Sequence, residues 1–482
     1  MTAGSLGTLR TTVDLAFAAP PGGAQGVYAA TWGQQEMWHK IAQHRPGGFY
    51  QLSQIIPVGE PRSLDTVLEC LRHLVGRHAS LRTTFHEDAG GLFQVIHRDG
   101  VLPVRVEEAP GEGRERATAA ALVDGFQEDE PLLDREFAPR LAVVTRGGAA
   151  TYLVLVCSHV VLDGHSERVL ASELRTLLAA ADAPAEAEAE AEARTVLPPV
   201  GHGPAEQAGA EARAKSRRTS ARSVAYWRAT LADAPPALFP SPTEPSAAAP
   251  IWCGRLASEA LATAEATLVR SGLGSGALWL SAVARVLAAH TGRPATTFRL
   301  PVSNRFDQAL DGYVGNLSQH TVVTVDTAAG TFRELARRVE RDLMRAYFHA
   351  RYDPAELAEA TTEIESRRGA PLDLTYLFND VRSRNGKPRA APADPATAEA
   401  EESGESGESG VSWELLHSSN SDIKLHVRVT ETRGRPRLDI AADTSCLSRS
   451  AITDALFAVE RLLVEAAREA EYGAGQGAAP AP

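Results

Sequence analysis

The chain has 482 residues, of which 44% are hydrophobic and 23% are charged. That length exceeds one ordinary hydrophobic core and predicts two or three domain-sized units, and the composition excludes a fibrous or disordered protein. No apolar stretch approaches the roughly 20 residues of a membrane-spanning helix. We therefore expect a globular protein with no membrane partner.

The net charge of −12 is concentrated in two low-complexity runs. Residues 182–194 hold five acidic side chains against one arginine, and residues 394–408 hold six acidic side chains. These runs account for −10 of the net charge, so the remainder is close to neutral. Nothing in it favours nucleic acid as a partner.

The four cysteines lie far apart, at Cys70, Cys157, Cys253 and Cys446. This spacing predicts neither a disulfide framework nor a zinc site, and indicates reduced thiols in a cytoplasmic protein. The N-terminal residues also lack the charged start and long apolar centre of a secretory signal. We predict no metal and no bound cofactor.

Helix and strand patterns are mixed along the first part of the chain. Residues 63–78 carry apolar side chains at helical spacing, and residues 91–98 alternate as a strand does. Residues 151–161 form an almost unbroken apolar run, which predicts a strand covered on both faces. Residues 165–181 then carry a helical pattern, so the sequence predicts a strand, a tight loop and a helix.

The second part repeats the mixture, with a helix over 277–292 that stops near Gly292, several strands, and a closing amphipathic helix from Ala451. The predicted class is α/β with mixed sheets. We expect a first lobe at 26–180, an Ala/Glu/Pro-rich linker at 181–222, and a second lobe at 223–470 with a disordered insertion near 384–410.

The loop Ser158-His159-Val160-Val161-Leu162-Asp163-Gly164 is the strongest candidate for chemistry. A histidine placed at the end of a buried strand is held by the sheet, and its ordinary pKa leaves it largely neutral and able to accept a proton. Gly164 allows another group to approach the backbone closely. Taken alone, a structural histidine is the more common explanation of such a pattern.

This loop resembles the HHxxxDG signature of the condensation-domain family of nonribosomal peptide synthesis, within the CoA-dependent, chloramphenicol-acetyltransferase-like acyltransferases. Other segments resemble family motifs in the same order: TWGQQEMW (31–38) is similar to SxAQxRMW, and RHASLRTTF (77–85) matches RHxxLRTxF. YWRATLADAPPALFP, PVSNRFDQALDGYVGNLSQH and the strands after Ile423 also resemble the family's elements. The likeness covers nearly the whole chain.

The resemblance implies two chloramphenicol-acetyltransferase-like lobes in a V, with a tunnel between them. By position His159 would be the catalytic histidine, and Asp163 would be structural, paired with Arg305. Gly164 would let a backbone N–H approach the thioester oxygen as charge develops there. Ser158 replaces the first histidine of the signature, and Gln319 and His320 stand in the altered stretch that would line the substrate chamber.

The activity implied is amide formation, by transfer of an acyl group from a phosphopantetheine thioester to an amine. The carrier would be an acyl or peptidyl carrier protein met in trans by a stand-alone enzyme, with coenzyme A as a second source of the thioester. Two alternatives stay open: a non-catalytic module that binds carrier proteins and recruits another enzyme, and an ester-forming enzyme with an alcohol acceptor.

Overall fold

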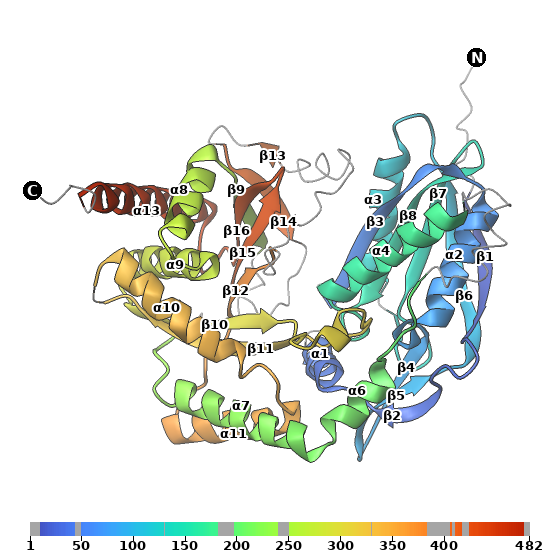
Figure 1. Cartoon of the computed structure of the whole chain (residues 1–482), viewed down its shortest axis with the longest axis horizontal. Helices are drawn as coiled ribbons and strands as arrows, with labels where there is room; N and C mark the ends of the chain where they lie inside the picture. Colours follow the sequence, from blue (N-terminus) through green and yellow to red (C-terminus); the bar gives the residue numbers. More distant parts are fainter. Residues whose placement is uncertain are drawn as a thin grey trace, which may run out of the picture. The chain divides into compact units, whose positions relative to one another are not determined.

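The computed structural model describes residues 10–43, 50–129, 131–181, 197–239, 250–328, 330–382, 405–406, 410–416 and 424–476. These residues form two compact units, each with its own hydrophobic core (Figure 1). The first unit comprises Met1–Arg217 together with Ser303–Gln319, and the second comprises Arg218–Val302 and His320–Pro482.

The first unit is built on a five-stranded mixed sheet in the order β1-β6-β7-β8-β3, in which β6 and β7 are parallel. A three-stranded antiparallel sheet in the order β2-β5-β4 accompanies it. The strands are β1 (Arg10–Ala18), β2 (Gly26–Ala29), β3 (Gln51–Arg62), β4 (Thr83–Asp88), β5 (Gly91–Ile96), β6 (Asp99–Glu108), β7 (Arg140–Arg146) and β8 (Ala149–Ser158).

Helices cover both faces of the five-stranded sheet. Leu71 and Leu74 of one helix pack with Leu170 and Leu174 of another on one face, and Leu122 of a third lies in the cluster on the opposite face. The helices of this unit are α1 (Trp32–Gln43), α2 (Leu64–Arg77), α3 (Glu115–Glu128), α4 (Gly164–Ala181) and α6 (Pro204–Glu211), with a 3-10 turn at Ala79–Arg82.

The second unit is built on an eight-stranded mixed sheet in the order β11-β10-β12-β15-β16-β9-β14-β13. Its strands are β9 (Ile251–Leu256), β10 (Ala295–Val302), β11 (Gln319–Asp326), β12 (Tyr376–Asp380), β13 (Glu405–Ser406), β14 (Ser412–Leu416), β15 (Leu425–Thr432) and β16 (Arg435–Asp443). The two pairs formed by β10 with β12 and by β12 with β15 are parallel.

One face of this sheet packs against four helices around the fully buried Trp279, as the helices beside the sheet in Figure 1 show. A smaller cluster joins Trp227, Ile364 and Val322. The helices are α7 (Ala214–Ala232), α8 (Glu259–Arg270), α9 (Ser275–Thr291), α10 (Phe332–Tyr347), α11 (Pro354–Arg368) and α13 (Arg449–Gln476), with a 3-10 turn at Gln308–Leu310 in the segment that joins the first unit.

The predicted helices are confirmed where their apolar spacing was clear. Helix α2 begins after Ser63, whose side chain accepts a hydrogen bond from the Thr66 N–H, and α9 ends at Gly292 with a left-handed φ of 70°. The predicted α/β class with mixed sheets is confirmed as well.

Three details differ from the sequence analysis. Strand β8 ends at Ser158 rather than running to Val161, because the chain turns at His159 while Val160 and Val161 remain buried. The linker expected at 181–222 contains helix α6 and the beginning of helix α7. Their buried residues within this range include Gln207, Glu211 and Ser220, so no apolar periodicity predicted these helices. Residues 303–319 pack into the first unit, although a continuous second lobe was expected. The insertion expected near 384–410 lies largely outside the described residues.

Candidate active site

The turn that carries His159 is fixed by backbone hydrogen bonds and by apolar burial. The His159 N–H donates to the Tyr50 carbonyl at 2.8 Å, and the Val161 N–H donates to the Ser158 carbonyl at 3.0 Å. Val160, Val161 and Leu162 have no exposed surface. Because these three side chains anchor the turn in the core, the loop presents His159 in one orientation.

The imidazole of His159 is partly buried, and its Nδ1 atom is fully buried. Among the described residues Nδ1 has no hydrogen-bond partner. Burial lowers the pKa of His159 below its ordinary value, although the nearby carboxylate of Asp163 opposes that shift. The ring is therefore neutral at neutral pH and retains a lone pair that can accept a proton.

Asp163 has no exposed surface and forms the ion pair expected from the resemblance, with Arg305 Nη1 2.5 Å from its Oδ2 atom. The Ser166 N–H and hydroxyl donate to Oδ1 at 3.0 and 2.9 Å, and the Leu317 N–H donates to Oδ2 at 3.1 Å. Burial alone would raise the pKa of Asp163, but Arg305 and these donors hold it below its ordinary value. Asp163 is thus charged at neutral pH, and its contacts make it the structural centre of the loop.

Arg305 completes this structural centre. Its Nη2 atom donates to the Ser166 hydroxyl and the Gly315 carbonyl, both at 3.1 Å, and its guanidinium carbon lies 5.6 Å from the centre of the Tyr313 ring. All of these partners belong to the first unit. The ion pair therefore ties the segment 303–319 to the β8–α4 loop.

Asn316 was not singled out in the sequence, yet it contacts the His159 loop directly. Its side-chain amide donates to the His159 carbonyl at 2.8 Å and to the Gly33 carbonyl at 3.1 Å, and its side-chain oxygen accepts from the Ser318 N–H at 3.0 Å. Gly33 accommodates this contact because a Cβ there would lie 2.6 Å from the Asn316 carbonyl oxygen. The sequence signal was present, since Asn316 directly precedes the altered 317–320 stretch and Gly33 lies in the first motif.

The remaining predicted residues take different places. Ser158 is buried and its hydroxyl accepts from the Val160 N–H at 3.4 Å, so it supports the turn. Gly164 is exposed at the start of α4, and a Cβ there would meet nothing within 4 Å, which leaves its backbone approachable. Gln319 is buried and its side-chain oxygen lies 3.5 Å from the Asn304 amide, whereas His320 belongs to the second unit, beside His426.

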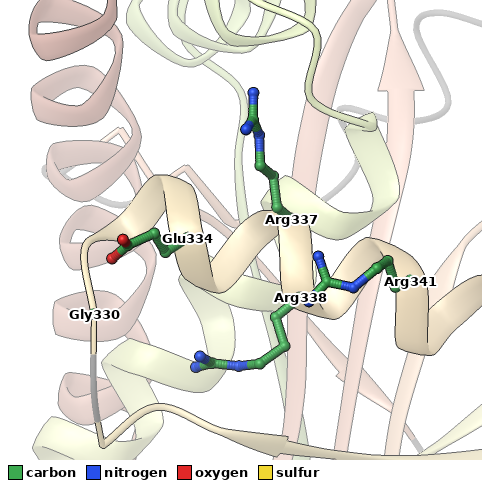
Figure 2. A pocket seen from close by; sticks show the side chains of 5 residues that line it. All are labelled: Gly330, Glu334, Arg337, Arg338 and Arg341. Carbon is green, nitrogen blue, oxygen red and sulfur yellow. The ribbon is translucent and has the colours of Figure 1, made fainter.

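A separate open pocket of about 440 Å³ lies on α10 and is lined by Gly330, Glu334, Arg337, Arg338 and Arg341 (Figure 2). The side chain of Glu334 caps the helix through Thr331, and Figure 2 shows the three arginines extending from the helix. None of the residues predicted for the reaction lies in this pocket.

Within the described residues, no group of three or more histidine, cysteine, aspartate or glutamate side chains is placed to hold a metal ion. In the same part of the chain, no helix is both long enough and apolar enough to cross a membrane.

Comparisons with known proteins identify the family of this chain. Residues 24–476 match the family described as the condensation domain. Phosphinothricin tripeptide synthetase PhsC of Streptomyces viridochromogenes is 27% identical over 371 residues, and tyrocidine synthase 3 of Brevibacillus parabrevis is 23% identical over 368 residues. Each match covers 74% of the chain, but only 33% and 5% of the length of the two relatives.

Solved structures share the fold at low sequence identity. The first condensation domain of the CDA synthetase superposes with a TM-score of 0.67 at 18% identity, over 92% of this chain and 96% of that domain. The epimerization domain of tyrocidine synthetase B superposes with a TM-score of 0.69 at 13% identity, over 93% and 98%. Since condensation and epimerization domains share this fold, the structural likeness establishes the architecture and not the reaction.

The match across residues 24–476 establishes the family: this chain belongs to the condensation domains of nonribosomal peptide synthesis.

Proposed function

We propose that this condensation domain transfers an acyl group from a phosphopantetheine thioester to an amine and forms an amide. The observation that carries the proposal is a neutral imidazole, His159, fixed at a strand end above the buried Asp163–Arg305 pair. The donor is proposed to be an acyl or peptidyl carrier protein, with coenzyme A as a second source of the same thioester arm.

The reaction needs a group that accepts a proton as the carbon–nitrogen bond forms. A neutral amine attacks the thioester carbonyl, the nitrogen becomes positively charged, and His159 takes its proton. The proton then passes to the sulfur as the carbon–sulfur bond breaks, so the products are an amide and a free thiol. A positioned base of this kind contributes roughly 10²–10⁴-fold to the rate.

Gly164 is proposed to stabilise the oxygen of the tetrahedral intermediate. It is the first residue of α4, where backbone N–H groups have no partner within the helix and the helix dipole is positive. A Cβ at this position would meet no protein atom within 4 Å, so a thioester oxygen has room to approach. The tunnel expected between the lobes stays a prediction.

The test compares the wild-type chain with His159→Ala and with His39→Ala, an exposed histidine in the same unit. With a loaded carrier protein or an acyl-coenzyme A and an amine acceptor, we expect His159→Ala to lower product formation roughly 10²–10⁴-fold and His39→Ala to leave it unchanged. Mass spectrometry of the product identifies an amide, and the matching alcohol acceptor tests for an ester. Equal rates for wild type and His159→Ala would contradict the proposed role of His159 as the catalytic base. Absence of product with every donor would favour a non-catalytic chain.

A further inference from the structure

Asn316, in the segment 303–319, has a side chain whose hydrogen-bonding groups are all used inside the first unit. The side chain has no exposed surface, and its amide nitrogen donates to the His159 carbonyl at 2.8 Å and to the Gly33 carbonyl at 3.1 Å. Its oxygen accepts from the Ser318 N–H at 3.0 Å. Three separate stretches of backbone therefore meet at one buried amide.

The partners of this amide fix which way round it lies. Gly33 and His159 each offer a carbonyl oxygen, which can only accept, and Ser318 offers an N–H group, which can only donate. A carboxylate of the same size could still accept from Ser318, but it would face two carbonyl oxygens with no proton to donate. The position therefore requires an amide and not only a polar side chain of similar size.

His159 is held through the two peptide groups on either side of its Cα atom. Its N–H donates to the Tyr50 carbonyl at 2.8 Å, and its own carbonyl accepts from the Asn316 amide at 2.8 Å. With both peptide planes fixed, the direction in which the Cβ atom leaves the backbone is fixed too, and the ring turns only about its side-chain torsions. Loss of the Asn316 bond would release one of these two planes.

Asn316 also joins the reaction loop, residues 158–164, to the start of α1. The Thr31 hydroxyl donates to the Asn316 backbone carbonyl at 3.4 Å, and the Gly33 carbonyl accepts from the Asn316 side chain. A Cβ at Gly33 would lie 2.6 Å from the Asn316 carbonyl oxygen. Because the backbone of α1 packs this closely against Asn316, the amide has little freedom to move away from the loop.

We propose that Asn316 is the positioning residue for His159, and that its amide holds the imidazole in register with residues 317–319, part of the stretch predicted to line the substrate chamber. This inference rests on the proposed amide-forming function. The amide nitrogen fixes the backbone of the base, and the amide oxygen fixes the backbone at Ser318. A base must lie within hydrogen-bond reach of the attacking amine, and a misplacement of about 1 Å costs roughly 10²-fold in rate.

The first unit contains a matched control in Gln94. Its side chain also has no exposed surface, its amide nitrogen donates to the carbonyls of Ala29 and Pro204, both at 3.0 Å, and its oxygen accepts from another side-chain amide at 3.3 Å. None of these partners belongs to the reaction loop. Gln94→Glu therefore makes the same chemical change as Asn316→Asp, at an equally buried site, without removing a bond to the His159 backbone.

The first test measures kcat and KM of the full chain, of Asn316→Asp and of Gln94→Glu, each per folded protein as determined by circular dichroism. In Asn316→Asp the side-chain oxygen still accepts from Ser318, but the donor to His159 is lost. We expect kcat to fall roughly 10–10²-fold and KM to change by less than about threefold, whereas Gln94→Glu should keep both values. A kcat of Asn316→Asp equal to that of Gln94→Glu would overturn the inference and leave the proposed function standing.

The second test observes the His159 imidazole without turnover, by nitrogen-15 NMR of the full chain labelled in its histidine rings. The His159 signals are identified by their loss in His159→Gln. We expect Asn316→Ser, which buries no charge, to shift and broaden these signals because the ring is no longer held in one place, and Gln94→Ser to leave them unchanged. Unchanged His159 signals in Asn316→Ser would overturn the inference, whether or not Asn316→Asp folds.

The NMR comparison also separates the inference from the function on which it rests. If the wild type forms no product with any donor, the proposed function fails. Altered His159 signals in Asn316→Ser, beside unchanged signals in Gln94→Ser, would still show that Asn316 positions this ring, and equal signals in both variants would overturn that role.

Discussion

At the scale of single residues, the site is organised by one buried ion pair. Asp163 and Arg305 are 1% and 3% exposed in their side chains, so both charges depend on each other and on the surrounding hydrogen bonds. Removing one member of such a pair leaves an uncompensated charge in the interior, while removing both avoids that cost. The pair therefore acts on the shape of the loop and not on substrate.

We expect Asp163→Ala to lower the free energy of unfolding by about 3–5 kcal/mol, because Arg305 would be left buried without its partner. The double variant Asp163→Ala with Arg305→Met should be more stable than Asp163→Ala alone, since the unpaired charge is gone. Urea unfolding of the wild type, both single variants and the double variant measures the coupling between the two positions. Additive effects would show that the pair is not coupled.

The lowered pKa of His159 predicts how the free energy of unfolding changes at acidic pH. Its pKa is lower in the folded chain than in the unfolded one, so the unfolded chain binds more protons as the pH falls below about 6.5. The stability due to this group is present above that pH and is lost below it. The free energy of unfolding of His159→Gln should therefore fall less between pH 7 and pH 5 than that of the wild type, and parallel curves would contradict the lowered pKa.

The raised pKa of Glu167, in the first turn of α4, predicts a loss of stability at alkaline pH. Its pKa is raised in the folded chain, so the folded chain binds more protons than the unfolded one between the ordinary glutamate pKa and about 8. The stability due to the protonated group is present at low pH and is lost as the pH rises through that range. Glu167→Gln should gain stability relative to the wild type at pH 9, as thermal unfolding at pH 5 and pH 9 would measure.

At the scale of elements, the first turn of α1 fits closely against the segment 303–319. The Asn316 carbonyl oxygen would lie 2.6 Å from a Cβ at Gly33, and both atoms involved belong to backbone that cannot rotate away. Asn316 also holds the His159 carbonyl. A change at Gly33 should therefore reach the reaction loop through Asn316.

We expect Gly33→Ala to destabilise the chain by about 1–3 kcal/mol, as overpacking does, and to lower activity through displacement of Asn316. Gly125→Ala in α3 is the matched control, because a Cβ there would meet nothing within 4 Å and alanine favours a helix interior. Thermal unfolding and the acyl-transfer assay measure both effects. A Gly33→Ala variant as stable as Gly125→Ala would contradict the close approach.

The elements also show what could be read from sequence. Helices α2 and α4 follow from the helical spacing of their apolar residues, and strand β8 follows from an almost unbroken apolar run. The Asp163–Arg305 pair was predicted from the family resemblance. The spacing of residues along the chain could not predict it, because the partners are 142 residues apart. Asn316 was missed although it directly precedes the altered stretch, because its hydrogen bond to the His159 carbonyl joins positions 157 residues apart.

At the scale of the whole molecule, segments that pack together should unfold together, even where they are distant in sequence. Residues 303–319 lie between β10 and β11 of the second unit in sequence, yet they pack in the first unit through Arg305, Gly315 and Asn316. Local stability is set by such packing, and hydrogen exchange reports it segment by segment.

We expect Asp163→Ala to increase amide hydrogen exchange in residues 303–319 together with β8 and α4, while β10 and β11 keep their protection. Leu335→Ala, which opens the core of the second unit, should do the reverse. Peptide-resolved exchange by mass spectrometry measures both variants. Protection of 303–319 that follows β10 and β11 in both variants would contradict its assignment to the first unit.

Because residues 303–319 belong to the first unit, they constrain how chimeras of homologous chains can be built. The polypeptide passes from one unit to the other after Arg217, after Val302 and again after Gln319. A chimera joined at a single crossover near residue 218 would inherit a foreign Arg305 and Asn316 beneath its native His159 loop. Exchange of an intact first unit between homologues requires three junctions, and the short middle piece has to travel with the histidine that it supports.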